Sequence, residues 1–241
     1  IITESSKNLR ALGRNALAGN WKVAIIAILI YTLITSIPPA IFNEYFGVSV
    51  NDMYTNGNYY GMDADLYTDI YSVVPRYSPL SALYSLLVSG AMQLGISLFF
   101  LALFRRQLVE ATDIFLGFEK FGKALGLFVY ISVKTFLWSL LFVIPGIIAA
   151  MRYSQAFYIL ADDPTKGIKQ CVEESKYMMN GNKSKFFCLT LSFVGWVILA
   201  AVISTLISEL GAFLGMDGIL LSIIVTIGNL TMIPVTVYMS S

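Results

Sequence analysis

The chain has 241 residues, of which 57% are hydrophobic and only 13% are charged, against about 25% charged residues in a typical soluble domain. The formal net charge of +1 provides no strongly basic field, so nucleic acid is not expected as a partner. Because the sequence contains no histidine, the commonest general base and the commonest metal ligand are both missing, and we expect no enzymatic activity, no metal and no cofactor.

Long apolar stretches dominate the chain and predict an all-α fold. About 20 apolar residues in a helix cross a bilayer core of about 30 Å, and lipid cannot satisfy open backbone groups, so each such stretch should be helical. The stretches with few or no charges are residues 23–42, 77–104, 126–144, 147–161, 186–208 and 218–241. The sequence therefore predicts a polytopic transmembrane helical bundle with about six membrane segments.

Basic residues set the predicted orientation, because the cytoplasmic loops of membrane proteins carry an excess of Lys and Arg. Lys7, Arg10 and Arg14 precede the first apolar stretch, and the segment 162–185 contains five lysines. Both termini should therefore lie in the cytoplasm. Residues 43–76 should then form an extracellular loop, which is acidic and rich in tyrosine.

The region 124–161 has to cross twice, or enter and return, because basic segments flank it on both sides. Pro145 and Gly146 stand where the chain has to reverse, and we interpret them as the turn of a hairpin or as a hinge. The return, residues 147–161, has 15 residues and is short for a full crossing. A re-entrant hairpin is therefore the alternative to two full crossings.

Three amphipathic stretches precede membrane segments, at residues 5–20, 107–123 and 164–180. Each places apolar residues at helical spacing opposite charged ones and is predicted to lie as a helix in the cytoplasmic-side interface. Asp163 and Pro164 should begin the third helix as its cap and its first-turn proline.

This order predicts a single transmembrane domain, residues 1–241, built from three units of interfacial helix and hairpin at 5–104, 107–161 and 164–239. The dipeptides Gly19-Asn20 and Gly181-Asn182 stand at equivalent joints between helix and membrane segment and favour a repeat. Repeats are common in transport folds, but duplicated hairpins also occur in inert scaffolds.

Two cations, Lys134 and Arg152, lie inside apolar stretches, where a charge costs at least about 2.5–3.5 kcal/mol. At a helical rise of about 1.5 Å per residue, each lies ~12–14 Å from the inner end of its segment, so their depths should be similar. No acid lies in any predicted membrane segment to pair with them. We expect them to bind an anion such as a lipid phosphate, a carboxylate or a phosphorylated solute. The alternative is that both long side chains extend to the inner interface.

Small and polar residues inside the apolar stretches are expected to mediate helix packing. Gln93, Gln155 and Asn229 should form hydrogen bonds between helices. A stripe of small residues near the end of the chain permits close helix approach, either within the chain or in a dimer. It comprises Ala200, Ser204, Ser208 and Ala212, with Gly211 and Gly215 beside them.

Several of these motifs together resemble a known family. They are LLFVIPGIIAAMRYSQAFYILA at residues 140–161 with the Asp-Asp-Pro that follows, Glu-Ser-Lys at 174–176, FFCLTLSFVGW at 186–196, and the two Gly-Asn joints. They are similar to a bacterial, Firmicute-type integral membrane family catalogued as domain of unknown function 975. The resemblance implies a multi-pass protein of the bacterial cell membrane. The family has no established activity, so no residue role is transferred, and the loop 43–76 departs from its pattern.

The expected function is therefore a non-enzymatic one. The sequence has no Walker A loop and no GxSxG, HExxH or GxGxxG motif, so we assign no catalytic residue. We expect a protein that handles or transports an amphipathic or anionic ligand or a lipid, with Lys134 and Arg152 as the anion contact and membrane lipids as partners. The alternative is an accessory or scaffold subunit of a transporter or secretion machinery that acts through other membrane protein subunits.

Overall fold

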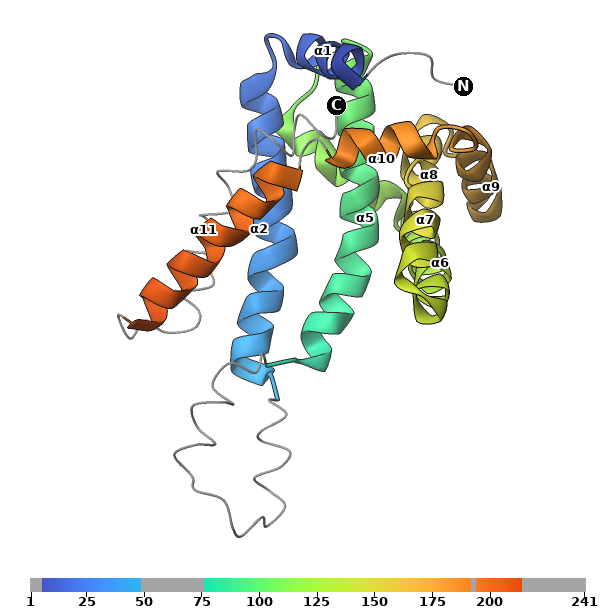
Figure 1. The fold of residues 1–241 in the computed structure, drawn as a ribbon. Coiled ribbons are helices and arrows are strands. Elements are labelled where there is room, and N and C mark those ends of the chain that lie inside the picture. The colour runs from blue at the N-terminus through green and yellow to red at the C-terminus, as the bar shows by residue number, and fades with distance from the viewer. Residues whose placement is uncertain (1–5, 49–75, 192–193, 214–241) are drawn as a thin grey trace.

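The computed structural model describes residues 6–48, 76–191 and 194–213. These residues form α1 (Ser6–Leu17), α2 (Trp21–Phe46), α5 (Pro79–Phe104), the 3₁₀ helix η1 (Ala111–Lys120), α6 (Phe121–Leu141), α7 (Val143–Tyr153), α8 (Ala156–Asp162), α9 (Ile168–Met178), α10 (Lys183–Leu191) and α11 (Val194–Phe213). Over these ranges the only β-type pairing is an isolated antiparallel bridge between Val48 and Tyr77. The predicted all-α fold is therefore confirmed for this part of the chain (Figure 1).

Four helical stretches in the described ranges are long and apolar enough to cross a membrane. They are Trp21–Phe46, Pro79–Phe104, Ala111–Leu141 and Val143–Asp162, and they contain most of the first four predicted membrane segments. The fifth predicted segment, 186–208, falls on two helices, α10 and α11, which point in different directions (Figure 1). The sixth, 218–241, lies outside the described residues.

α5 lies at the centre of the described fold and packs against α2, η1, α6 and α8. Its buried side chains divide between two hydrophobic clusters. Met92, Ile96, Phe99, Phe100 and Leu103 of α5 pack with residues of α1, α2 and η1. Leu94 packs on the other side with buried residues of α6, α7, α8 and α9. One helix therefore holds both halves of the structure together.

Glycines bring the backbones of α5 and η1 into direct contact. A Cβ atom on Gly95 would overlap the carbonyl group of Ile114, and one on Gly117 would overlap the carbonyl oxygen of Ala91. Small residues allow this close helix approach where no hydrophobic force distinguishes a neighbouring helix from lipid. The contact fixes η1 against the middle of α5.

α2 continues through Pro38 and Pro39, although proline cannot donate a backbone hydrogen bond. The missing N–H of Pro38 leaves the carbonyl of Ile34 without its intrahelical donor. The hydroxyl of Tyr84 on α5 donates a hydrogen bond to that carbonyl at 2.9 Å. Pro38 is therefore tolerated because the neighbouring helix supplies the missing donor, as expected in an apolar environment.

A second hydrogen bond joins the same two helices. The hydroxyl of Tyr31 on α2 donates to Oε1 of Gln93 on α5 at 3.4 Å. The prediction that Gln93 bonds between helices is confirmed, whereas Asn229 lies outside the described residues.

α2 is longer than predicted. α2 extends to Phe46, so the loop begins four residues later than the predicted start at residue 43. Asn43 holds the two ends together, because its Oδ1 accepts hydrogen bonds from the Ser78 amide at 2.9 Å and the Ser81 hydroxyl at 2.5 Å. Residues 49–75 of the predicted extracellular loop lie outside the described residues.

The turn between α6 and α7 falls at Phe142, so the prediction that Pro145 and Gly146 form it is wrong. Phe142 has an extended backbone (φ −162°, ψ 152°) between the two helices. Pro145 lies in the first turn of α7, where its N–H would lack an intrahelical acceptor in any case. Gly146 is buried, and a Cβ on it would overlap the Ser139 side chain of α6. The pair therefore starts α7 and lets it pack closely on α6.

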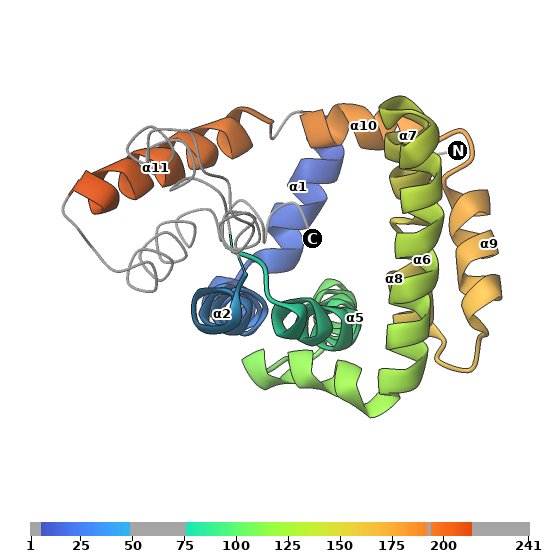
Figure 2. The same ribbon diagram turned by 90° about the horizontal axis from the view of Figure 1, so that it is seen from below.

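α6 does not run alongside α2 and α5. Figure 2 shows α2 and α5 nearly end-on, whereas α6 is seen along its length. The start of α6 packs on α5, where a Cβ on Gly90 would lie 3.0 Å from the carbonyl oxygen of Ala124. Its far half is exposed and apolar, with Val133, Phe136, Leu137, Leu140 and Leu141 on the surface. Because α6 is not parallel to α2 and α5, the number of residues between Lys134 and the end of its segment does not give its depth.

The stretches predicted as interfacial helices are helical, with two corrections. Residues 111–120 form a 3₁₀ helix, whose three-residue period aligns Phe115, Phe118 and Phe121 with ring centroids 6.4 and 6.5 Å apart. α9 begins at Ile168 with Gly167 as its N-cap, so Asp163 does not cap it. Asp163 instead ends α8 and accepts hydrogen bonds from the amide and hydroxyl of Thr165, at 3.0 and 2.6 Å, because the chain has to turn before α9.

We expect Gly117→Ala to destabilise the fold. The added methyl group overlaps the backbone of α5, and overpacking of this kind costs about 1–3 kcal/mol, or about 2–4 °C in Tm per kcal/mol for a chain of this size. Gly122→Ala is the matched control, because a Cβ there meets nothing within 4 Å. Thermal unfolding in detergent should show a lower Tm for Gly117→Ala only. Equal Tm values for the two variants would contradict the close η1–α5 contact.

Candidate functional site

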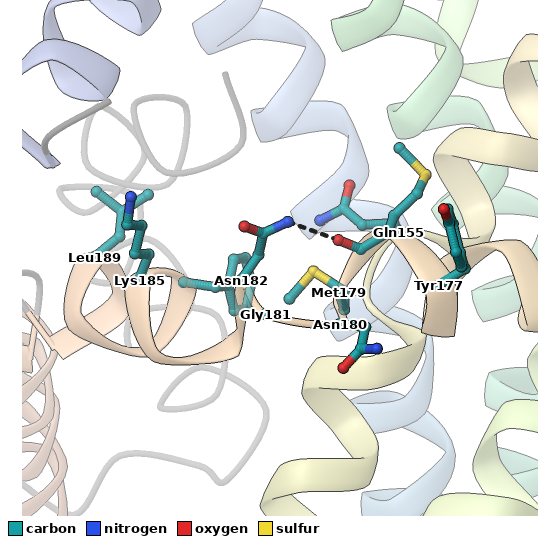
Figure 3. Close-up of a pocket in the computed structure, with 10 residues that line it drawn as sticks. Gln155, Tyr177, Met179, Asn180, Gly181, Asn182, Lys185 and Leu189 are labelled. Carbon is teal, nitrogen blue, oxygen red and sulfur yellow. Dashed lines mark hydrogen bonds between the residues drawn. The ribbon is translucent and has the colours of Figure 1, made fainter. Parts of the chain in front are cut away.

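A cavity of about 760 Å³ lies where α9 meets α10, next to the start of α8 (Figure 3). Its size falls within the range of about 300–1,000 Å³ that is usual for ligand pockets. Figure 3 shows Lys185 and Leu189 of α10 on one side of the joint, Gln155 and Tyr177 on the other, and Met179 and Asn182 between them. The lining consists of Gln155, Tyr177, Met178, Met179, Asn180, Gly181, Asn182, Lys185, Phe186 and Leu189.

The joint that forms the cavity depends on Gly181 and Asn182. Gly181 has a φ of +81°, a conformation that glycine adopts without steric cost. Asn182 is 9% exposed, and its side-chain amide donates to the carbonyl of Met178 at 2.8 Å. Its backbone amide donates to the Met179 carbonyl at 3.2 Å, and its own carbonyl accepts from Phe186 at 3.0 Å. Asn182 therefore ends α9 and begins α10.

The first Gly-Asn joint, between α1 and α2, has the same geometry. Gly19 has a φ of +88°. The Asn20 amide donates to the Leu17 carbonyl at 2.9 Å, and the Asn20 carbonyl accepts from Ala24 at 3.0 Å. Leu17, at 0% exposed, matches Met179, at 4% exposed. The two joints correspond in glycine conformation, in backbone hydrogen bonds and in the burial of Leu17 and Met179, whereas the Asn20 side chain makes no cap bond like that of Asn182.

The lining of the cavity is amphipathic. Met178, Met179, Phe186 and Leu189 supply apolar surface, while the amides of Gln155, Asn180 and Asn182 and the Tyr177 hydroxyl supply polar groups. Among the lining residues that the structure describes, Lys185 carries the only charge. Such a combination suits a ligand with an anionic head and an apolar tail.

The acids of α9 are already bound to lysines. Glu174 accepts from Lys166 at 2.6 Å, and Glu173 accepts from Lys176 at 2.6 Å. The hydrogen bonds from Lys166 and Gln170 hold the pKa of Glu174 below its usual value, so it stays ionised and paired. Neither carboxylate lines the cavity, so neither opposes an anion beside Lys185.

Ser175 holds the base of the cavity in place. It is fully buried on α9, and its hydroxyl donates to the Arg152 carbonyl at 2.7 Å and accepts from the Gln155 amide at 3.3 Å. These two bonds attach α9 to the junction between α7 and α8. The side-chain amide of Gln155, which we expected to bond between helices, instead donates to the adjacent Ser154 hydroxyl at 3.3 Å and lines the cavity.

The two predicted anion-binding cations lie on the two arms of the α6–α7 hairpin. Lys134 is exposed on α6, with Nζ 5.7 Å from the centroid of the Tyr130 ring. Arg152 is partly buried in the last turn of α7. Within the described part of the chain, neither forms an ion pair, and neither lines the cavity. The cavity is therefore a site that the sequence did not predict.

The small-residue stripe lies on α11. Ala200, Ser204, Ser208, Gly211 and Ala212 all fall within that helix, and Gly215 lies outside the described residues. Their role in helix packing stays a prediction. Large apolar residues, offset by two positions from the stripe, are exposed along α11: Ile198, Val202, Leu206 and Leu210.

Charged contacts tie together the helix ends near α9. Arg105, after the end of α5, forms an ion pair with Asp162 at the end of α8. Lys123 at the start of α6 donates to the Pro164 carbonyl at 2.7 Å. These contacts join α5, α6 and α8 at the end of the molecule that is predicted to be cytoplasmic.

The signal that could have located the cavity is the Gly181-Asn182 pair followed by Lys185 and Phe186. A glycine in the left-handed region opens an angle between two helices, and a lysine one turn into the second helix then faces that angle. From spacing alone, Lys185 was counted only as one more cytoplasmic charge, because the direction of α10 depends on its tertiary contacts.

The fold defines an all-helical protein with helices suited to crossing a membrane and an amphipathic cavity at one end of them. Residues 140–240 match the family described as Protein of unknown function (DUF975), which agrees with the resemblance in the motifs. The match includes α7 to α11 and the whole lining of the cavity. No curated protein and no solved structure matches the chain.

We expect Gly181→Ala to destabilise the α9–α10 joint more than Gly181→Asn. A residue with a Cβ pays about 1–2 kcal/mol in the left-handed region, but Asn adopts that conformation far more readily than Ala. In thermal unfolding, the Tm should be highest for the wild type, lower for Gly181→Asn and lowest for Gly181→Ala. If Ala is tolerated as well as Asn, the positive φ at this position is not a requirement of the fold.

Proposed function

We propose that this protein is a non-enzymatic, multi-pass protein of the bacterial cell membrane that binds an anionic amphiphile or anionic lipid in the α9–α10 cavity and handles or transports it. The observation that carries the proposal is the lining of the cavity, which combines one cation and several amides with a wall of Met, Phe and Leu side chains. An ionised head would bind at Lys185 and Asn180, and its apolar chain would lie against Phe186 and Leu189.

The place of the cavity in the fold supports this ligand class. α9 carries its charges on one side and buries Cys171, Val172 and Ser175 on the other, as an interfacial helix does. α10 starts with Lys183 and Lys185 and continues into apolar residues. A cavity between two such helices lies at the level where phospholipid heads meet their chains.

The distribution of helices supports the predicted orientation. In Figure 1, α1, α9 and α10 lie toward one end of the α2–α5 pair, and the last turn of α2 and the first turn of α5 lie at the other. We propose that the first end is cytoplasmic, that residues 43–76 are extracellular, and that the chain has about six membrane segments with both termini inside. The steep angle of α6 supports a re-entrant hairpin over two full crossings, and the matching Gly-Asn joints support a duplicated unit.

The alternative function is that of an accessory or scaffold subunit. One observation favours it: α11 exposes a row of four large apolar residues, Ile198, Val202, Leu206 and Leu210. Purification in gentle detergent tests this alternative, because a protein that stays a lone monomer in every detergent does not act through a stable partner.

Labelling of single cysteines tests the orientation. In a background without Cys171 and Cys188, Tyr60→Cys should react with an impermeant maleimide on intact cells, whereas Lys169→Cys should react only after lysis. The positive-inside distribution of the basic residues is the physical reason. The reverse labelling pattern would invert the topology.

Binding of dodecyl phosphate tests the function. We expect Lys185→Gln to weaken binding roughly tenfold, since a hydrogen bond to a charged group contributes about 1.5–3 kcal/mol. Lys183→Gln is the matched control, because Lys183 is two residues away and does not line the cavity. Titration in a nonionic detergent gives both affinities.

Two further comparisons test whether the apolar chain of the ligand and the position of the lysine matter for binding. Inorganic phosphate should bind far more weakly than dodecyl phosphate, because it lacks the apolar chain. The proposal is refuted if wild-type protein does not bind dodecyl phosphate, or if Lys183→Gln and Lys185→Gln lose affinity equally.

A further inference from the structure

Lys134 is not explained by the cavity. It is exposed on α6 among the apolar surface residues Val133, Phe136 and Leu137. A lysine in such surroundings is costly unless its ammonium group has a partner. Within the described residues it makes a cation–π contact with Tyr130 and no ion pair.

Tyr130 and Lys134 are one helical turn apart on α6, so they share a face of that helix. Tyr130 is partly buried and packs against the cluster that contains Tyr153 of α7. Its hydroxyl group forms no hydrogen bond to any residue that the structure describes. A half-buried donor on the same helix face as an ammonium group is suited to an anionic acceptor.

α9 brings a second cation to the hydrophobic cluster against which Tyr130 packs. Lys176 lies with Nζ 6.0 Å from the centroid of the Tyr153 ring. The hydrogen bond that its ammonium group donates to Glu173 raises its pKa, with smaller contributions from Tyr153 and Tyr130. α6, α7 and α9 pack against one another in this region. Lys134, Lys176 and Glu173 together carry a net charge of +1, and Glu173 is held by Lys176 at 2.6 Å.

We propose that Tyr130, Lys134 and Lys176 form a second site, which binds the phosphate group of an anionic membrane lipid on the outside of the α6–α7–α9 junction. Ammonium groups and a phenol hydroxyl donate to phosphate oxygens, and the exposed apolar half of α6 beside Lys134 receives the acyl chains. The site is separate from the α9–α10 cavity and does not rest on the function proposed for it.

The apolar surroundings assign the phosphate to a lipid. Phe136 is 65% exposed and Leu140 is 72% exposed on the same arm of the hairpin. A free phosphate ion gains nothing from these side chains, whereas lipid chains cover them. Comparing the binding of phosphatidylglycerol, phosphatidylcholine and inorganic phosphate therefore distinguishes a lipid phosphate from a free phosphate ion.

The experiment measures lipid binding to the purified full chain in the Lys185→Gln background, so that the cavity contributes little. Lys134→Gln should weaken phosphatidylglycerol binding about fivefold, the contribution of one lysine near an anionic lipid surface. Tyr130→Phe removes only the hydroxyl group that is proposed to donate to the phosphate, so it should also weaken phosphatidylglycerol binding. Lys169→Gln, on the exposed side of α9, is the matched control and should leave it unchanged.

Native mass spectrometry supplies a second readout, in which Lys134→Gln should retain one phosphatidylglycerol fewer than its parent. Phosphatidylcholine should bind more weakly than phosphatidylglycerol, and millimolar inorganic phosphate should not displace the lipid. The proposal is overturned if Lys134→Gln binds phosphatidylglycerol as its parent does, or if Lys169→Gln loses as much. It is also overturned if inorganic phosphate displaces the lipid, since the site then recognises a free ion. None of these results depends on dodecyl phosphate binding at Lys185.

Discussion

Backbone groups in apolar surroundings have to find partners within the protein, and this constraint shapes the described structure. It explains why the long apolar stretches are helices and why helix irregularities are repaired by neighbours. Pro38 leaves the Ile34 carbonyl without a donor, and Tyr84 of α5 supplies one. At the start of α5 the partner is local: Ser78 caps the helix, and its hydroxyl accepts from the Leu80 amide at 3.2 Å. α5 is central because its residues pack with α1, α2 and η1 on one side and with α6 to α9 on the other.

Close contact between helices follows from the same setting. Lipid competes for any large apolar side chain, so specific packing relies on short distances between backbones. Gly95 and Gly117 bring η1 onto α5, Gly90 brings α6 onto α5, and Gly146 brings α7 onto α6. The steep crossing of α6 over α5 begins at one of these contacts. Lys134 lies over the Tyr130 ring for a local reason, because the two residues are one turn apart on α6 itself.

Several expectations could be derived from residues near one another in sequence, and several could not. Helices, their apolar faces and the first two membrane segments follow from periodicity and length. The turn at Phe142 was misplaced, because the Pro145-Gly146 pair resembles a turn but in fact serves a helix start and a close contact. Asp163 was assigned to the wrong helix end for a related reason: Asp and Pro favour both caps and turns. Lys185 was overlooked because nothing local distinguishes a lysine that lines a cavity from one in solvent.

The sequence by itself determined that this protein is helical, that four or more of its segments suit a membrane, and that its basic residues gather at certain segment ends. These properties depend on composition and spacing within one segment, so they need no knowledge of neighbours. Only the tertiary structure decided the angle of α6, the cavity between α9 and α10, and the contact of Lys176 on α9 with Tyr153 on α7. Each of these depends on contacts between residues far apart in the chain, and the crossing of two helices is set by which side chains are small where they touch.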